Sequence, residues 1–372
     1  MATTYKTLSA NDIVTTKTLL HEAIPITGTI VSGTYKSGNN ELSIKNYTHG
    51  MFQSVFDYPH LSSSANHIFD ISVGFHATSS LSGSSAGHVQ VSKKINMYNQ
   101  MAQVLMGYDE NGNIRRFDAD GNLTDTTTDK MDEVIFINFA RLLTKDEIKK
   151  GSFNLELGVN DAFATPFSER IKLSDTTAQN DFRVNSPAGE YAVLFADTTV
   201  QGPSNNDRLT QDNGTQKAGL LYYQAGIAVI TASVFLSSGS NGMLIDAGGG
   251  DSKMDSANKT ISKLLSGSAI SASCDALRHR VYNLSFNNTT ELNSTVYFCR
   301  AHHNEFNYST NPTYLSSSQI VVKNNASDSP VSYITTVGLY SSDNELLATA
   351  KLSEPLKKDP SNELTLRVRL DY

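Results

Sequence analysis

The feature that most constrains the fold is a series of short strand-like segments in the last ninety residues. They are apolar or alternate apolar with polar residues, and they cover 281–286, 295–301, 319–322, 332–340, 346–352 and 363–370. Turn-forming groups separate them, namely Asn287-Asn288, Asn311-Pro312, Ser342-Asp343-Asn344 and Asp359-Pro360. Short β-branched and aromatic runs between turn signals are typical of strands. The sequence therefore predicts an all-β C-terminal region, 281–372, built as a sandwich or barrel.

The rest of the chain divides into two further regions. In the N-terminal region, 1–92, short apolar groups at 24–31, 51–56 and 68–73 predict strands, and 79–87 predicts a flexible loop. The middle region, 93–280, mixes helix and strand patterns. We therefore expect a mainly β fold with a few short helices, of the α+β class, in three regions.

The middle region begins with a helix pattern. Ile95, Tyr98, Met101, Leu105 and Tyr108 recur at a spacing of three or four residues, which predicts an amphipathic helix from residue 94. The run 133–139 predicts a core strand, 153–159 a half-buried strand, and 218–235 either a buried helix or a pair of core strands. Residues 257–265 and 271–280 are candidate short helices, and 200–216 and 237–256 read as loops.

A second helix is predicted after the strand 133–139. Thr144 and Glu147 have the spacing of a capping box, in which each side chain bonds the other residue's backbone N–H. Gly151 would end this helix after about two turns, since glycine adopts the left-handed conformation that terminates helices.

Two turn motifs, Asn111-Gly112-Asn113 and Asp120-Gly121-Asn122, predict a projecting β-ribbon over 108–125. Oxygen ligands spaced two residues apart also occur in calcium loops. The glycine is fourth in each run, however, and the twelfth position holds Asp and not Glu. We interpret both motifs as hairpin turns, with calcium as the alternative, and expect Asn111, Asn113, Asp120 and Asn122 to contact a partner protein.

Composition excludes several classes of function. The chain has 30 Lys and Arg against 37 Asp and Glu, a net charge of −7, which argues against a nucleic-acid partner. The lysine pairs at 93–94, 149–150 and 357–358 read as solvated surface. We expect no signal peptide and no membrane span, because apolar runs are short and interrupted. Two cysteines predict reduced thiols in a protein assembled in the cytoplasm.

Catalytic and metal motifs are weak. Cys299, His302 and His303, with Cys274 and His279 upstream, raise the question of zinc. Adjacent histidines on a strand point to opposite faces, so we predict no metal site. The glycines at 248–250 lack the Gly-Lys-Ser or Gly-Lys-Thr ending of a P-loop. We expect no enzyme activity and no cofactor.

The segment 304–314 mixes aromatic residues with asparagine. Phe306, Tyr308, Asn311 and Tyr314 are candidates for contact with a partner, because tyrosine-rich loops provide contact area at small entropic cost. A loop folded onto its own domain is the equal alternative.

The stretch 284–372 resembles virion structural proteins of contractile-tailed, T-even-like phages of marine cyanobacteria. The resemblance rests on NNTTELNSTVYFCRAHHNEFNYSTNPTY, VSYITTVGLYSSDNELLATAKLSEPLKK and LRVRLDY, with KKINMYNQMAQVLMGYD, INFARLLTKDEIKKG and GLLYYQAGIAVITASVF earlier in the chain. It implies a structural subunit of the virion tail, in particular the baseplate wedge. Its implied partners are other virion proteins, in several symmetry-related copies. A receptor-binding or fibre-attachment adaptor, a neck or head protein, and lastly a particle-borne hydrolase are the alternatives.

Overall fold

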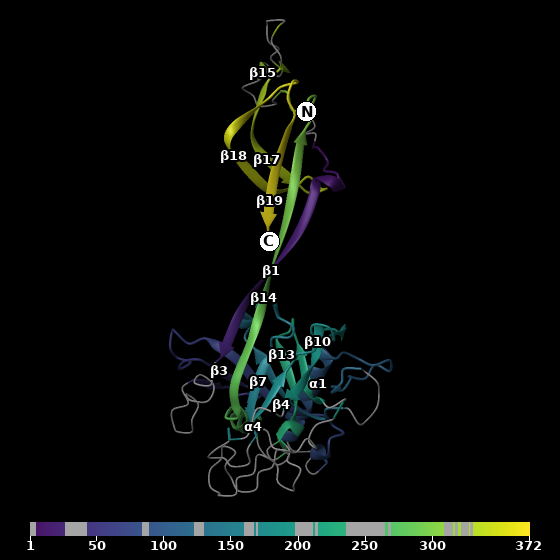
Figure 1. Ribbon diagram of the computed structural model, residues 1–372, viewed down its shortest axis with the longest axis vertical. Helices are drawn as coiled ribbons and strands as arrows, with labels where there is room; N and C mark the ends of the chain where they lie inside the picture. Colours follow the sequence, from purple (N-terminus) through teal and green to yellow (C-terminus); the bar gives the residue numbers. More distant parts are fainter. Residues whose placement is uncertain are drawn as a thin grey trace. The chain divides into compact units, whose positions relative to one another are not determined.

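The chain forms two compact units. Unit 2 comprises residues 21–290, and unit 1 comprises residues 1–20 with 291–372. The computed structural model describes residues 5–26, 43–83, 89–122, 130–159, 167–168, 170–197, 211–212, 215–235, 265–266, 269–308, 315–316, 319–320, 327 and 330–372 (Figure 1). Two long strands, β1 (Ile13–Ile26) and β14 (Val281–Ala301), contribute residues to both units.

The fold is mainly β with few helices, as the sequence predicts. Unit 2 holds most of a large sheet, whose strands follow the order β14-β7-β8-β10-β12-β13-β5-β4-β3-β2. Their bounds are β2 (Ile44–Asn46), β3 (Gln53–Phe56), β4 (His67–Phe75), β5 (Glu133–Phe139), β7 (Asn154–Gly158), β8 (Arg170–Ser174), β10 (Gly189–Asp197), β12 (Thr215–Tyr222) and β13 (Ile227–Thr231). The short strands β6 (Glu147–Ile148), β9 (Arg183–Ser186) and β11 (Gln211–Asp212) pair with β14, β10 and β12.

Alternation along the central strands gives unit 2 two apolar cores, one on each face of the sheet. On β5, Ile135 and Ile137 belong to one buried cluster, whereas Val134 and Phe136 belong to the other. Helix α1 (Val89–Leu105) packs in the second cluster and α4 (Ile270–Arg278) in the first, so each core includes one helix (Figure 1). Short helical turns complete the set: η1 (Ala10–Asp12), η3 (Ser80–Ser82), α2 (Arg141–Thr144) and η5 (Ala232–Phe235).

Several predicted elements of unit 2 are confirmed. The helix from residue 94 is α1, the core strand 133–139 is β5, and the half-buried strand 153–159 is β7. The apolar run 218–235 contains a pair of core strands, β12 and β13, joined by a turn in which Gly226 has φ +67°. The helix predicted at 271–280 is α4. Of the predicted loop 200–216, the described residues 211–212 and 215–216 belong to strands β11 and β12, so the loop is wrong there. The loop 237–256 and all but Leu265 of the helix 257–265 lie outside the described residues.

The helix predicted after Thr144 is wrong. The single turn α2 ends at Thr144, and Lys145 has φ +56° and ψ −122°, outside the helical region, so the helix stops there. Glu147 and Ile148 then form β6, which pairs with Thr289 and Asn288 of β14. The helix does not form despite its capping signal, because pairing with β14 supplies hydrogen-bond partners for the backbone groups of Glu147 and Ile148.

The turn predicted at Asn287-Asn288 is also wrong, because β14 continues through it. The backbone oxygen of Asn287 accepts a hydrogen bond from Lys149 N at 2.7 Å. The Asn288 side chain accepts one from Glu22 N at 3.1 Å and donates one to Leu143 O at 2.9 Å. Neighbouring segments therefore satisfy both asparagines in an extended conformation.

Unit 1 is all-β in its described residues, apart from the turn η1. β19 (Leu364–Asp371) pairs antiparallel with β14, from Ser294 opposite Asp371 to Ala301 opposite Leu364. β17 (Ser332–Tyr340) and β18 (Leu346–Lys358) form a separate two-stranded sheet, and β15 (Leu315–Ser316) pairs with β16 (Gln319–Ile320). Residues 92 and 93, between which the sequence analysis places a region boundary, both lie within α1.

Candidate functional site

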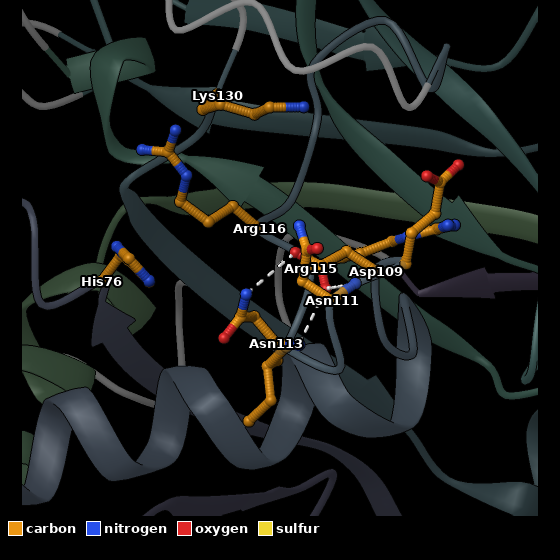
Figure 2. A pocket seen from close by; sticks show the side chains of 9 residues that line it. His76, Asp109, Asn111, Asn113, Arg115, Arg116 and Lys130 are labelled. Atoms are coloured by element: carbon orange, nitrogen blue, oxygen red, sulfur yellow. Dashed lines mark hydrogen bonds between the residues drawn. The ribbon is translucent and has the colours of Figure 1, made fainter.

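An open pocket of about 480 Å³ lies on unit 2, where the chain leaves helix α1 (Figure 2). Gly107 and Gly112 adopt positive φ, and Tyr108 and Ile114 form a bridge, so the segment makes a tight turn. The lining residues are His76, Asp109, Glu110, Asn111, Asn113, Ile114, Arg115, Arg116 and Lys130.

Asp109 serves the turn that forms one wall of this pocket. Its Oδ1 accepts hydrogen bonds from the backbone N–H of Asn113 at 2.8 Å and of Asn111 at 2.9 Å. These hydrogen bonds, that of Asn113 first, lower the pKa of Asp109. A carboxylate so stabilised in its ionised form is a poor general base.

The cations of the pocket are balanced by carboxylates. Lys130 Nζ lies 2.8 Å from Asp118 Oδ2, and Arg116 Nη1 lies 3.2 Å from Asp132 Oδ1. Burial raises the pKa of Asp118, although the hydrogen bond from Lys130 acts in the opposite direction. With Arg115 near Asp109 and Glu110, three cations meet four carboxylates, so the pocket offers no net positive charge to an anion.

His76 is the one imidazole that lines the pocket. Its Nδ1 lies 2.7 Å from Thr78 Oγ1 and accepts a hydrogen bond from Thr78 N at 3.2 Å. Burial lowers the pKa of His76. A nucleophile and its general base also pair a hydroxyl with an imidazole, but within the described residues no hydrogen bond orients Nε2. The contact is therefore that of a side chain capping a local turn.

In its described part, 108–122, the predicted ribbon is not a pair of regular strands. This part forms turns and isolated bridges between Tyr108 and Ile114 and between Asp118 and Lys130. Phe117 is fully buried in the second core and anchors the segment to the sheet.

The second turn motif is organised by its own carboxylates. Asp118 Oδ1 accepts from Asp120 N at 3.2 Å, and Asp120 accepts from the backbone and side chain of Asn122 at 3.0 and 2.6 Å. Asn111, Asn113 and Asn122 are exposed, and Asp120 is half-buried. Within the described part of the chain, no group of three or more His, Cys, Asp or Glu side chains is placed to hold a metal ion.

The cysteines and histidines considered for zinc are divided between the units. Cys274 is fully buried in unit 2, where Sγ donates to Ile71 O at 3.2 Å. Cys299 is half-buried in unit 1, and His302 and His303 are exposed there beside Glu363. His303 Nδ1 lies 3.4 Å from Glu363 Oε1.

The loop after β14 is held by Lys358, a buried lysine that the sequence analysis placed on the solvated surface. Lys358 Nζ donates to Asn307 Oδ1 at 2.8 Å, Asp359 O at 2.9 Å and His303 O at 3.3 Å. Its exposed neighbour Lys357 fits the prediction of a solvated pair, but Lys358 does not. Lys94 is likewise buried, and its Nζ donates to Leu265 O.

The fixed loop presents two aromatic side chains to solvent. Phe306 is 50% exposed and Tyr308 is 58% exposed, and Phe306 has φ +55°. Asn311 and Tyr314, the other predicted contacts of this loop, lie outside the described residues. The structure thus brings Phe306 and Tyr308 together on one exposed loop, and their contact with a partner stays a prediction.

Unit 1 carries an apolar surface that the sequence pattern alone did not reveal. We define the uncovered strand surface as the exposed large apolar residues of β1, β14, β17 and β18. They are Ile13, Val14, Leu19, Leu20, Leu292, Tyr333, Tyr340, Leu346, Leu347 and Leu356. Among the described residues of unit 1, the buried apolar side chains are Val296, Ala301 and Val368, whereas both large apolar clusters lie in unit 2.

No helix in the described residues is long and apolar enough to cross a membrane. No protein-family model, no curated protein and no solved structure matches the chain.

Proposed function

We propose that the protein is a non-enzymatic structural subunit of a multi-protein particle. One observation carries this proposal: in its described residues, unit 1 exposes large apolar side chains on its strands and buries almost none. Strand β1 has every residue from Ile13 to Leu20 exposed, including Leu19 and Leu20 at 49% and 50%.

Such strands need cover from elsewhere. An isolated two-stranded hairpin is at best marginally stable in water, and β17–β18 is a two-stranded sheet. Ordering a residue costs roughly 1–2 kcal/mol of backbone entropy, which apolar burial normally offsets. Only three apolar side chains are buried among the described residues of unit 1. This small core supports a role in which neighbouring subunits supply the missing apolar contacts.

The resemblance to contractile-tailed phage proteins supplies the kind of particle. We place the subunit in the virion tail, in the baseplate wedge, with other virion proteins as partners. Extended strands with open edges suit this role, because identical or different subunits bind through flat faces and main-chain pairing.

The test is the location of the chain in purified particles. Mass spectrometry of gradient-purified virions is expected to find it at a fixed ratio to the sheath protein. Electron cryomicroscopy is expected to place it with sixfold symmetry beneath the sheath. Absence from intact particles would contradict the structural role, and placement at a head vertex would contradict only the baseplate assignment.

A second candidate function, attachment to a receptor or fibre, is favoured by the exposed aromatics of the loop after β14. Phe306 and Tyr308 stand on a backbone fixed by Lys358, so they are preorganised for contact. Replacing Tyr308 with alanine is then expected to weaken adsorption to host cells while particles still assemble. Normal adsorption by assembled variant particles would remove this candidate.

A further inference from the structure

The uncovered strand surface is exposed on both faces of its strands. Neighbouring residues in a strand point to opposite faces. Ile13 and Val14, Leu19 and Leu20, and Leu346 and Leu347 are three such neighbouring pairs, and all six side chains are at least 39% exposed. A partner that binds one face of the strands would cover one residue of each pair and leave the side chain of the other residue exposed to water.

The edges of these strands are open as well. β1 is the end strand of its sheet, and β17 and β18 pair only with each other in the described residues. Open edges with apolar flanks are templates for another strand. Cover is therefore needed at two faces and at the edges between them.

Charge permits identical units to meet. Unit 1 contains nine Lys and Arg against ten Asp and Glu, a net charge of −1, out of the −7 of the whole chain. Its described charges also pair within the unit, for example Arg300 with Asp12 at 2.7 Å. A nearly neutral surface neither repels a copy of itself nor selects a strongly charged foreign partner.

The exposed apolar area is large enough for a stable interface. Ten side chains of the uncovered strand surface are 36–69% exposed. At roughly 150–250 Å² for an aromatic side chain, and somewhat less for an aliphatic one, the two faces together expose on the order of 1,000 Å². A contact that covers one face from each of two chains would bury about this much in total, which reaches the roughly 1,000 Å² expected of a biological interface.

We propose that the uncovered strand surface of unit 1 binds unit 1 of further copies of this chain in a closed ring. In a ring each chain lies between two neighbours, so both faces of β1 and β18 are covered by one repeated contact. The inference rests on the assembly function proposed above and names the partner within it. It predicts that the purified full-length protein is itself oligomeric.

Two matched leucines test the proposal. Leu347 on β18 of unit 1 and Leu142 on α2 of unit 2 are both 69% exposed. Leu347→Lys, and separately Leu20→Lys, place a charge in the proposed interface, whereas Leu142→Lys places it outside. We expect either unit 1 variant to weaken self-association at least tenfold and Leu142→Lys to leave it unchanged, measured by sedimentation over a concentration series.

The unmutated protein provides a reading that depends on no variant. Native mass spectrometry is expected to give a whole-number multiple of the 40.5 kDa chain, three or more, because each chain of a ring lies between two neighbours. A monomer or a dimer as the largest species throughout the series would overturn the proposal, and so would equal dissociation by Leu142→Lys. A monomer that is nevertheless present in virions would leave the structural role standing with a foreign partner. An oligomer absent from virions would overturn the structural role alone.

Discussion

At the scale of single residues, Asp175 is a buried carboxylate that joins separate parts of unit 2. It accepts hydrogen bonds from Gly151 N at 2.8 Å, Phe153 N at 2.9 Å and the Tyr223 hydroxyl at 2.9 Å. Burial raises its pKa, although these three hydrogen bonds each act to lower it. From its place directly after β8, the Asp175 carboxylate therefore fixes two features: the turn that leads into β7 and the ring of the buried Tyr223.

Replacing Asp175 with asparagine is expected to lower the free energy of unfolding by about 2–3 kcal/mol. The asparagine amide has one acceptor oxygen, and its NH₂ group would face N–H or O–H donors that now bond the second carboxylate oxygen. At least one of these buried donors would then lack an acceptor. Urea denaturation followed by circular dichroism measures the change. Asp181→Asn is the control, since Asp181 is exposed and pairs with Arg183 at the surface. Equal effects of the two substitutions would contradict the assigned role of Asp175.

His67 predicts a pH dependence of stability. Its Nε2 lies 2.8 Å from Asp70 Oδ1, and this hydrogen bond raises the pKa of His67. A histidine with a raised folded-state pKa stabilises the fold fully below its unfolded value of about 6.5. That contribution is lost as the pH rises through the folded pKa.

The difference in unfolding free energy between the wild type and His67→Gln isolates this effect. We expect a larger difference at about pH 5 than at about pH 9, from denaturation at each pH. The wild-type curve alone is not diagnostic, because burial lowers the pKa of His76 and gives the opposite trend. A difference that does not change with pH would refute the interpretation of the His67–Asp70 pair.

At the scale of elements, Gly74 sets how closely helix α1 approaches strand β4. A Cβ atom at this position would lie 2.9 Å from Tyr98 N and 3.0 Å from Lys94 O, both backbone atoms of the helix. Gly74→Ala is therefore expected to push the helix outward and cost about 1–3 kcal/mol of stability. Gly83→Ala is the control, because its nearest contact would be Ser80 O at 3.9 Å. Thermal unfolding of both variants decides, and equal melting temperatures would refute the close approach.

Elements with a strong internal pattern could be predicted, and elements that depend on distant partners could not. The spacing of Tyr98 and Leu105 is enough for α1, and the run of β5 is enough for a core strand. The helix expected after Thr144 failed because β6 pairs with β14, more than a hundred residues away. The turn expected at Asn288 does not form, because the backbone groups of Glu22 and Leu143, both distant in sequence, hydrogen-bond its side chain in an extended strand.

The candidate sites show the same division. The exposure of Phe306 and Tyr308 follows from a local asparagine-rich loop, whereas the burial of Lys358 depends on Asn307 and His303, about fifty residues earlier. The apolar residues of β1 and β18 can be identified from the sequence. Their exposure cannot, because it depends on whether other described parts of the chain pack against these strands.

At the scale of the whole molecule, the two units differ in what stabilises them. Unit 2 has a core on each face of its sheet. Its central strands β4, β5, β12 and β13 each pair with a strand on both sides. Unit 1 has strands but little core in its described residues. Under the proposal, the chain combines a unit that is stable alone with a unit that association stabilises.

Hydrogen exchange of the full-length protein tests this difference without any substitution. Amides exchange through local opening, whose free energy falls where few apolar contacts must be broken. In β5 and β12 of unit 2 we expect strong protection at every protein concentration. In β17 and β18 of unit 1 we expect fast exchange in dilute protein and slower exchange as the concentration rises, because binding to further copies adds the missing contacts. Mass spectrometry of peptic fragments over about a hundredfold range of concentration gives both readings in one experiment. Strong protection of β17 and β18 at the lowest concentration would mean that unit 1 is stable by itself and would remove the physical basis for its association.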